Sequence, residues 1–263
     1  MFIACVFYAL FTKDTVFVIM YYFCMFEIIG HRGAGVPTPE NTIESFAKAY
    51  ELGCSRVELD VHLTKDLQPV IIHDTIFDKK NEKYVHHFTW QELTTYNSET
   101  GKKIPRLSDC FSAFSNTKLH FQVELKGAET EKIVPALVAE FGLTARTRYT
   151  SFVHMRVKKA LQYHRAAGGL LMCAVPINPV ELLDQANADS FHLSWHHIDK
   201  RLVKHLHSKG KKLIAWNAVN KEAVFRILLD MGVDGATTDT PKQFLNYLEK
   251  YNTGLLNQQR SEV

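Results

Sequence analysis

The sequence has few cysteines, little net charge and no glycine-rich phosphate loop. Its five cysteines, Cys5, Cys24, Cys54, Cys110 and Cys173, form no Cys-x-x-Cys pair. This usage favours a reduced compartment and argues against a structural zinc site or a disulfide-supported core. The formal charge is only +3, and no Lys/Arg stripe with interleaved aromatics is present, so no nucleic-acid partner is expected. Without a Walker pattern, a nucleoside triphosphate is not implied either.

Length and composition are those of an ordinary globular protein. Hydrophobic residues make up 46% and charged residues 22% of the 263 residues, as in soluble globular chains. This length suits one large α/β domain, or two small ones, with ample surface to bury. The chain contains no evident internal repeat or low-complexity tract.

Residues 1–24 form an apolar extension whose only charged residues are Lys13 and Asp14. A secretory signal would need a basic segment before its apolar run and a small-residue cleavage site, and neither is clear. In a membrane span, each central charge would cost about 2.5–3.5 kcal/mol, against about 0.3–0.6 kcal/mol gained for each large apolar residue. We favour Met25 as the natural start, ahead of a membrane anchor and a cleaved signal. A cytoplasmic protein is then expected, with membrane association only through residues 1–24, and residues 251–263 form a polar C-terminal tail.

From Phe26 onward, short apolar runs alternate with amphipathic segments of helical length. Repeated βα units favour a parallel sheet, and their number favours a (β/α)8 barrel over an open sheet. Asn41, followed three residues later by Glu44, predicts a capping box at the start of the first helix. The predicted strands are 26–32, 57–63, 69–73, 119–125, 149–152, 169–175, 190–195, 212–219 and 236–238. The predicted helices are 43–52, 131–141, 155–164, 179–185, 200–208 and 222–231.

Nine strands are one too many for this barrel, so the fold is predicted to be an irregular TIM-type barrel over residues 25–250. The stretch VELDVHLTKDLQPVIIHD, residues 57–74, is predicted to form a hairpin with its turn near residues 65–68, and this hairpin accounts for the ninth strand. Residues 75–118 lack a strand pattern and hold short helices near 90–96 and 107–114. We expect them to form a short cap insertion between the third and fourth strand segments, folded over the barrel mouth.

Three carboxylates stand on strands that should be buried. Glu58 and Asp60 are two residues apart and therefore point to the same side of one strand. Glu124 lies at the end of the next barrel strand. Active sites of such barrels lie at the carboxyl ends of the strands, and three carboxylates suit a hard divalent cation such as Mg²⁺ or Ca²⁺.

Basic and titratable side chains occupy the same strand ends. Arg32 and Lys126 carry the charge and donors needed to hold a phosphate. Histidine is the usual residue for proton transfer near neutral pH, so His31 and His73 are a natural acid/base pair. A cation, two basic side chains and two histidines together indicate phosphoryl transfer, in which the protein positions groups and neutralises developing charge.

The motifs that carry these residues resemble the glycerophosphodiester phosphodiesterase family. HRG, ELDV and HD at their present spacings are together highly specific, although each alone would be weak. In chain order the motifs are HRG (31–33), PENT (39–42), ELDVHLTKD (58–66), PVIIHD (69–74), ELK (124–126), TSF (150–152), AWNAVN (215–220) and GVDGATTDTP (232–241).

The resemblance implies a barrel enzyme that hydrolyses glycerophosphodiesters, such as glycerophosphocholine or glycerophosphoethanolamine, to sn-glycerol 3-phosphate and an alcohol. In the family mechanism the substrate's own 2-hydroxyl attacks phosphorus, and the resulting cyclic phosphate is then hydrolysed. The family's functional positions map onto metal ligands Glu58, Asp60 and Glu124, catalytic His31 and His73, phosphate-binding Arg32 and Lys126, a substrate-stacking Trp216, and Glu40 at the edge of the site.

Departures from the family pattern leave the alcohol head group and the cap geometry open. Residues 65–67 read KDL where the family often has KDG, and residues 76–81 read IFDKKN after the HD motif. Two other functions stay in view, a lysophospholipase D-like activity on lysophospholipids and a non-catalytic phosphate-binding barrel. Asp239 is expected to cap the helix that follows it, and His62 is expected on the opposite side of its strand from Asp60.

Overall fold

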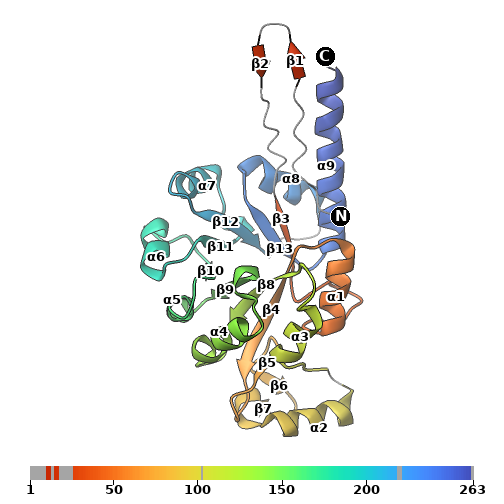
Figure 1. The fold of residues 1–263 in the computed structure, drawn as a ribbon, viewed down its shortest axis with the longest axis vertical. Coiled ribbons are helices and arrows are strands. Elements are labelled where there is room, and N and C mark those ends of the chain that lie inside the picture. Colours follow the sequence, from red (N-terminus) through yellow and green to blue (C-terminus); the bar gives the residue numbers. More distant parts are fainter. Residues whose placement is uncertain (1–9, 13–14, 18–25, 102, 218–220, 262–263) are drawn as a thin grey trace.

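Eight parallel strands close into a barrel within the part of the chain that the structure describes, residues 10–12, 15–17, 26–101, 103–217 and 221–261. In this computed structural model β3 pairs with both β13 and β4, which closes the ring. The predicted TIM-type barrel is therefore confirmed (Figure 1). In ring order the strands are β3 (Glu27–Gly30), β4 (Arg56–Leu63), β8 (His120–Leu125), β9 (Thr147–Ser151), β10 (Ala167–Met172), β11 (Ser190–Ser194), β12 (Lys212–Trp216) and β13 (Gly235–Thr238).

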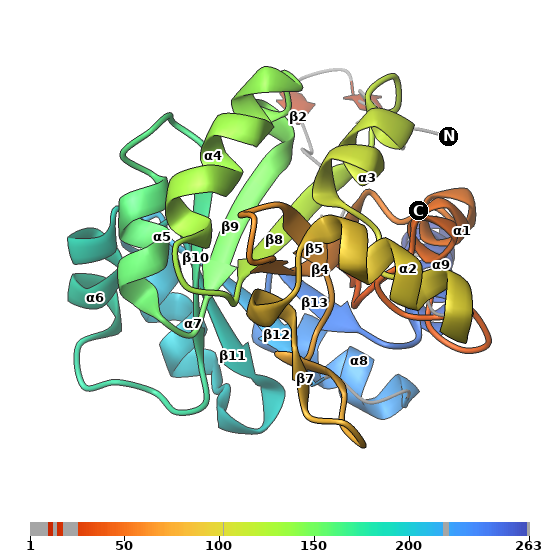
Figure 2. The ribbon, with the colours of Figure 1, turned by 90° about the horizontal axis from the view of Figure 1, so that it is seen from below.

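Helices surround this ring (Figure 2), and their apolar faces join the strands in one large core. The outer helices are α1 (Ile43–Leu52), α3 (Leu107–Phe114), α4 (Thr130–Glu140), α5 (His154–Ala160), α6 (Pro179–Ala186), α7 (Lys200–His207), α8 (Glu222–Met231) and α9 (Pro241–Ser261), with 3₁₀ turns η2 (Thr144–Arg146) and η3 (Trp195–His197).

Helix α1 spans the predicted residues 43–52, but its N-cap lies one residue later than the sequence analysis predicted. Thr42 is its N-cap, because the Thr42 side chain accepts a hydrogen bond from the Ser45 backbone N–H. Gly53 ends the helix with a φ of 107°, a left-handed conformation that glycine adopts without steric cost. The predicted cap, Asn41, is therefore wrong, and its side chain serves the site described below.

The insertion exists but is shorter than predicted. Strand β6 (Ile76–Asp78), the turn η1 (Val85–His87) and helix α2 (Trp90–Thr100) share a small separate core with Val70 and Ile104, and β7 (Lys83–Tyr84) pairs with β6. Helix α3, by contrast, contributes buried residues to the main barrel core. The insertion thus ends before α3, and residues 107–114 belong to the barrel. Strand β5 (Pro69–Ile71) pairs antiparallel with β4, as the predicted hairpin required.

The C-terminal region differs from the sequence-based picture, and the N-terminal extension is described only in part. Residues 10–12 and 15–17 form an antiparallel pair, β1 (Leu10–Thr12) and β2 (Thr15–Phe17), and the rest of the predicted apolar extension lies outside the described residues. Helix α9 runs on to Ser261, so residues 251–261 continue a helix instead of starting a separate tail. None of the described helices is both long enough and apolar enough to span a membrane.

A buried ion cluster lies at the amino ends of the barrel strands. Glu27 accepts hydrogen bonds from Arg56 at 2.7 Å and from Arg148 at 2.9 Å. The two arginines offset the burial of the carboxylate, so the pKa of Glu27 falls to about 2 even though burial alone would raise it. The cluster joins β3, β4 and β9 at the end of the barrel opposite the site.

Candidate active site

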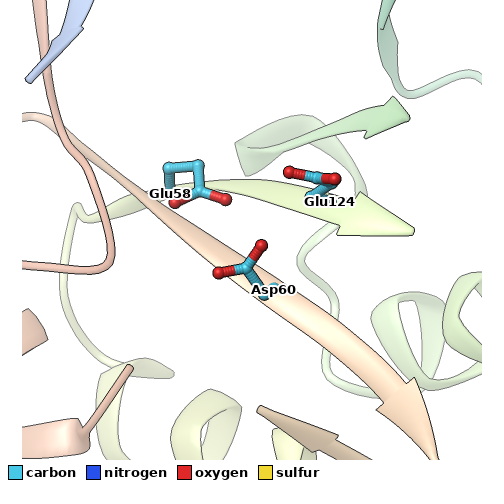
Figure 3. Close-up of side chains that lie close together, drawn as sticks. All are labelled: Glu58, Asp60 and Glu124. Atoms are coloured by element: carbon cyan, nitrogen blue, oxygen red, sulfur yellow. The ribbon is translucent and has the colours of Figure 1, made fainter. Parts of the chain in front are cut away.

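Three carboxylates from two neighbouring strands converge inside the barrel (Figure 3). Glu58 and Asp60 lie on β4 and Glu124 on β8, and the parallel register pairs Asp60 directly with Glu124. Ligand oxygens of all three lie within 4.8 Å of one another. The metal-ligand prediction thus has the right geometry, since the alternation of β4 and the β4–β8 register bring together residues far apart in sequence.

The electrostatics of this cluster suit a cation. Burial, followed by the charges of Asp60 and Glu124, raises the pKa of Glu58 well above its usual value. Burial and then Asp60 raise the pKa of Glu124 to about 7. Oε1 of Glu58 is buried without a hydrogen-bond partner among the described residues. An all-oxygen donor set with an unpartnered carboxylate oxygen fits a hard divalent ion, which would compensate the crowded negative charge.

Arg32 and Lys126 border the carboxylates. Nζ of Lys126 lies 3.3 Å from Asp60 and 3.7 Å from Glu124, and Nε of Arg32 lies 3.3 Å from Asp60. These cations keep the pKa of Asp60 below its usual value even though burial raises it. Arg32 also contacts Glu40 at 2.9 Å, so Glu40, which is 63% exposed, lies at the edge of the site through this ion pair.

The loop after β3 contributes a backbone N–H group to the site as well as side chains. Arg32 has a φ of 52°, and its backbone N–H donates to Glu58 at 3.0 Å. Gly30 permits this turn, because a Cβ there would lie 2.3 Å from the Gly33 carbonyl oxygen. A non-glycine residue held at positive φ is characteristic of functional sites, where the surrounding structure supports the strain.

Asn41, at the end of the same loop, has a role that the sequence analysis missed. Its Nδ2 donates to Asp60 at 2.8 Å, and this hydrogen bond helps to lower the pKa of Asp60. The PENT motif was the available signal, but the capping pattern drew attention to the helix instead. Asn41 thus orients one carboxylate of the acidic cluster through a hydrogen bond. Residues that hydrogen-bond to metal ligands commonly orient them in this way.

Each proposed catalytic histidine is paired with a carboxylate. Nδ1 of His31 bonds Asp239 at 2.5 Å, and Nδ1 of His73 bonds Asp74 at 2.6 Å. A carboxylate can only accept, so each Nδ1 carries a proton and each Nε2 is left for proton transfer. Asp239 is therefore a partner of His31, 208 positions away in the chain, a contact that the sequence analysis did not foresee.

The two histidines, two of the three clustered carboxylates and both basic side chains line one cavity of about 210 Å³. Gln122 and Thr237 form part of its wall, and each has a buried oxygen without a partner among the described residues. Trp216 donates from Nε1 to two backbone carbonyls at 3.2 Å, and its ring lies 5.9 Å from that of Phe152. The cavity is lined by His31, Arg32, Glu58, His73, Gln122, Glu124, Lys126, Phe152, Leu171, Trp216, Asn217, Thr237 and Asp239.

His62 departs from its predicted position. It is two residues from Asp60 and so faces the same side of β4, where its Nε2 lies 3.3 Å from the His73 carbonyl oxygen. Burial lowers its pKa to about 4, which keeps the ring neutral near pH 7. His62 thus supports the backbone of His73 and lies outside the cavity that holds the two catalytic candidates.

Comparison with known proteins agrees with this geometry. The chain is 32% identical over 241 residues to a glycerophosphodiester phosphodiesterase of Caldanaerobacter subterraneus subsp. tengcongensis, covering 85% of this chain and 98% of the relative. It is 25% identical to a human lysophospholipase D, covering 85% and 86%.

A solved phosphodiesterase from Oleispira antarctica, in complex with the product sn-glycerol-3-phosphate, has the same fold, with a TM-score of 0.75 at 24% identity, covering 85% of this chain and 96% of that one. The model of the glycerophosphoryl diester phosphodiesterase family matches residues 31–243. The chain therefore belongs to the glycerophosphoryl diester phosphodiesterase family.

Proposed function

We propose that this protein is a divalent-metal-dependent phosphodiesterase that hydrolyses glycerophosphodiesters, such as glycerophosphocholine or glycerophosphoethanolamine, to sn-glycerol 3-phosphate and an alcohol. The observation that carries the proposal is a single cavity bordered by a three-carboxylate cluster and by two histidines, each paired with its own carboxylate. A barrel that only bound phosphate would need the basic residues but no pair of proton-transfer groups, so the arrangement favours catalysis over binding.

Glu58, Asp60 and Glu124 would hold the metal ion, and their oxygen donors favour Mg²⁺ or Ca²⁺ over zinc. When bound, the ion would polarise the phosphoryl group and neutralise charge developing on its oxygens. Arg32 and Lys126, which border the carboxylates, would donate hydrogen bonds to the phosphate oxygens.

The two histidines would move the protons. One neutral histidine takes the proton of the substrate 2-hydroxyl as the hydroxyl oxygen attacks phosphorus. The bond between phosphorus and the alcohol oxygen breaks, and the other histidine, in its protonated form, gives its proton to that oxygen. Water then opens the cyclic phosphate at the 2-oxygen with the histidine roles reversed, which yields sn-glycerol 3-phosphate. Asp239 and Asp74 would hold His31 and His73 in the Nδ1–H tautomer throughout.

The relatives support this substrate class. The product named with the Oleispira antarctica phosphodiesterase is the one expected here. The human lysophospholipase D supports a second candidate, hydrolysis of lysophospholipids. That candidate is favoured by one observation, the half-exposed Phe152 beside Trp216 at the cavity wall, because an aromatic edge open to solvent can accommodate an acyl chain. The cytoplasmic location stays a prediction.

The test is release of sn-glycerol 3-phosphate from glycerophosphocholine and glycerophosphoethanolamine with Mg²⁺ or Ca²⁺, and again after chelation. We expect chelation to abolish release and added metal to restore it. His31→Ala and His73→Ala should each lower kcat by about 10²–10⁴-fold, the usual contribution of proton-transfer groups. The exposed His205 on α7 offers a matched control, and His205→Ala should keep full activity. Release that survives chelation, or an active His73→Ala, would contradict the proposal.

A further inference from the structure

Five large apolar side chains are exposed on two neighbouring connections of the barrel. They follow β9 and β10, which pair in parallel register. Four of them precede α5 and α6, which pack against each other, and Met155 lies in the first turn of α5. We call these five residues the apolar rim. Its members are Phe152 (47% exposed), Val153 (48%), Met155 (55%), Val175 (43%) and Ile177 (99%).

The rim lies on the side of the barrel where the strands end, and this is the side that holds the site. Two further exposed apolar residues, Val36 and Leu67, follow β3 and β4 on the same side. Elsewhere on the described surface, large apolar side chains of comparable exposure are Tyr50, Tyr163 and Ile227, which lie apart on α1, after α5 and on α8. Exposed apolar surface is therefore concentrated around the mouth, and such concentration marks an interaction site.

The rim is continuous with the catalytic cavity. Phe152 is a rim residue and also lines the cavity. Its ring contacts that of Trp216 edge to face at a centroid distance of 5.9 Å, and the indole N–H of Trp216 is bonded to backbone carbonyls. An apolar molecule seated on Phe152 would thus lie directly at the cavity wall.

The charge of the two connections indicates which kind of partner surface the rim would bind. Residues 173–178, CAVPIN, contain no charged side chain, and residues 152–155, FVHM, contain only the titratable His154. His154 is bonded through Nε2 to the Leu171 carbonyl oxygen. Apolar side chains on uncharged connections favour insertion between lipid head groups over electrostatic attraction. A second copy of the chain seated on the rim would cover the cavity edge at Phe152, whereas a lipid surface would present substrate there.

We propose that the apolar rim docks the catalytic mouth onto the surface of a phospholipid bilayer, so that phosphodiesters with an acyl chain enter the cavity from the lipid. The docking itself does not depend on the proposed reaction, and only the statement about entering substrate rests on the second candidate of the proposed function, hydrolysis of lysophospholipids.

The test is flotation of the full chain with vesicles of phosphatidylcholine. The variant Val175→Ser/Ile177→Ser removes two rim side chains that do not line the cavity. The control, Tyr163→Ser/Ile227→Ser, removes two exposed side chains away from the mouth. We expect the wild type and the control to float with the vesicles and the rim variant to partition about tenfold less. Salt at about 1 M, where the Debye length is about 3 Å, should change wild-type binding little.

Turnover of glycerophosphocholine in solution serves as the check on folding, and it should be equal in all three proteins. Turnover of lysophosphatidylcholine held in the same vesicles should fall about tenfold in the rim variant alone. Both variants keep residues 1–24, so the comparison isolates the rim.

Two results would overturn docking through the rim. These are a wild type that does not float and a rim variant that floats as well as the wild type. If that variant also changes a dimer into a monomer, the rim is an interface between two copies of the chain. A wild type that floats but hydrolyses neither substrate would instead refute the proposed function and leave the docking intact.

Discussion

Replacing Glu27 by glutamine tests the ion cluster at the amino ends of the barrel strands. The substitution keeps the shape of the side chain and removes its charge, which leaves Arg56 and Arg148 facing each other without a carboxylate between them. Removing one member of a buried ionic cluster is strongly destabilising, by about 3–5 kcal/mol, because uncompensated charge stays behind. Glu27→Gln should therefore lower the free energy of unfolding without touching the catalytic cavity.

The lowered pKa of Glu27 gives the size of its contribution to the free energy of unfolding. A lowering from 4.5 to about 2 corresponds to about 3.4 kcal/mol of stability, at about 1.4 kcal/mol for each unit of pKa. Burial and the charge of Arg148 lower the pKa of Arg56, so part of this gain is offset within the cluster. We expect a net cost of about 3 kcal/mol for Glu27→Gln at pH 7.

The dependence on pH follows from the sign of the shift. The folded protein holds Glu27 ionised more strongly than the unfolded chain does, so the stabilisation is fully present above pH 4.5 and is lost as the pH falls toward 2. The difference between wild type and Glu27→Gln should therefore shrink by about 2 kcal/mol between pH 7 and pH 3.

The assay is urea-induced unfolding across this pH range. The control is Glu51→Gln, which removes an exposed carboxylate paired with Lys48 on α1 and should cost less than about 1 kcal/mol. The reasoning is refuted if Glu27→Gln costs no more than this control, or if its cost is the same at pH 3 as at pH 7.

Two further predictions concern the residues behind the site. Asp239→Asn should lower kcat by about 10²-fold with a smaller effect on KM, because an amide can no longer impose the Nδ1–H tautomer on His31, and unchanged steady-state kinetics with soluble glycerophosphocholine would contradict this. Asn41→Ala removes the hydrogen bond to Asp60 and should raise the metal concentration needed for half-maximal activity by about 10–100-fold. A metal titration of activity measures it, and an unshifted midpoint would rule out the positioning role of Asn41.

Local chemistry determined the barrel elements and the acidic cluster. Apolar runs with a strand or helical period can be recognised without knowing their neighbours, and so β4, β8 and helix α3 were placed within a residue or two. Glu58 and Asp60 could be assigned to one side of a strand from their spacing alone. A parallel barrel also gathers strand ends on one face, so the convergence of Glu124 with these two acids could be expected before any coordinate was known.

Contacts between distant segments could not be derived this way. The end of the insertion depended on whether α3 packs against the barrel core or against the small core of the insertion. The sequence of this eight-residue helix does not indicate which of the two cores it contacts. Asn41 matched a capping pattern that occurs in many helices, so its hydrogen bond to Asp60 stayed hidden.

The sequence by itself determined the barrel fold, the cluster of three carboxylates that suits a metal ion, and the two histidines at strand ends. These features could be predicted because hydrophobic periodicity and residue spacing can be recognised within single strands and helices. Only the tertiary structure decided that Asp239 closes on His31, that Glu27 binds arginines from two other strands, and that the rim side chains gather beside the cavity. Barrel closure and register bring Asp239 within hydrogen-bond distance of His31, 208 positions away, and Arg148 within hydrogen-bond distance of Glu27, 121 positions away. Local sequence patterns carry no signal of such contacts.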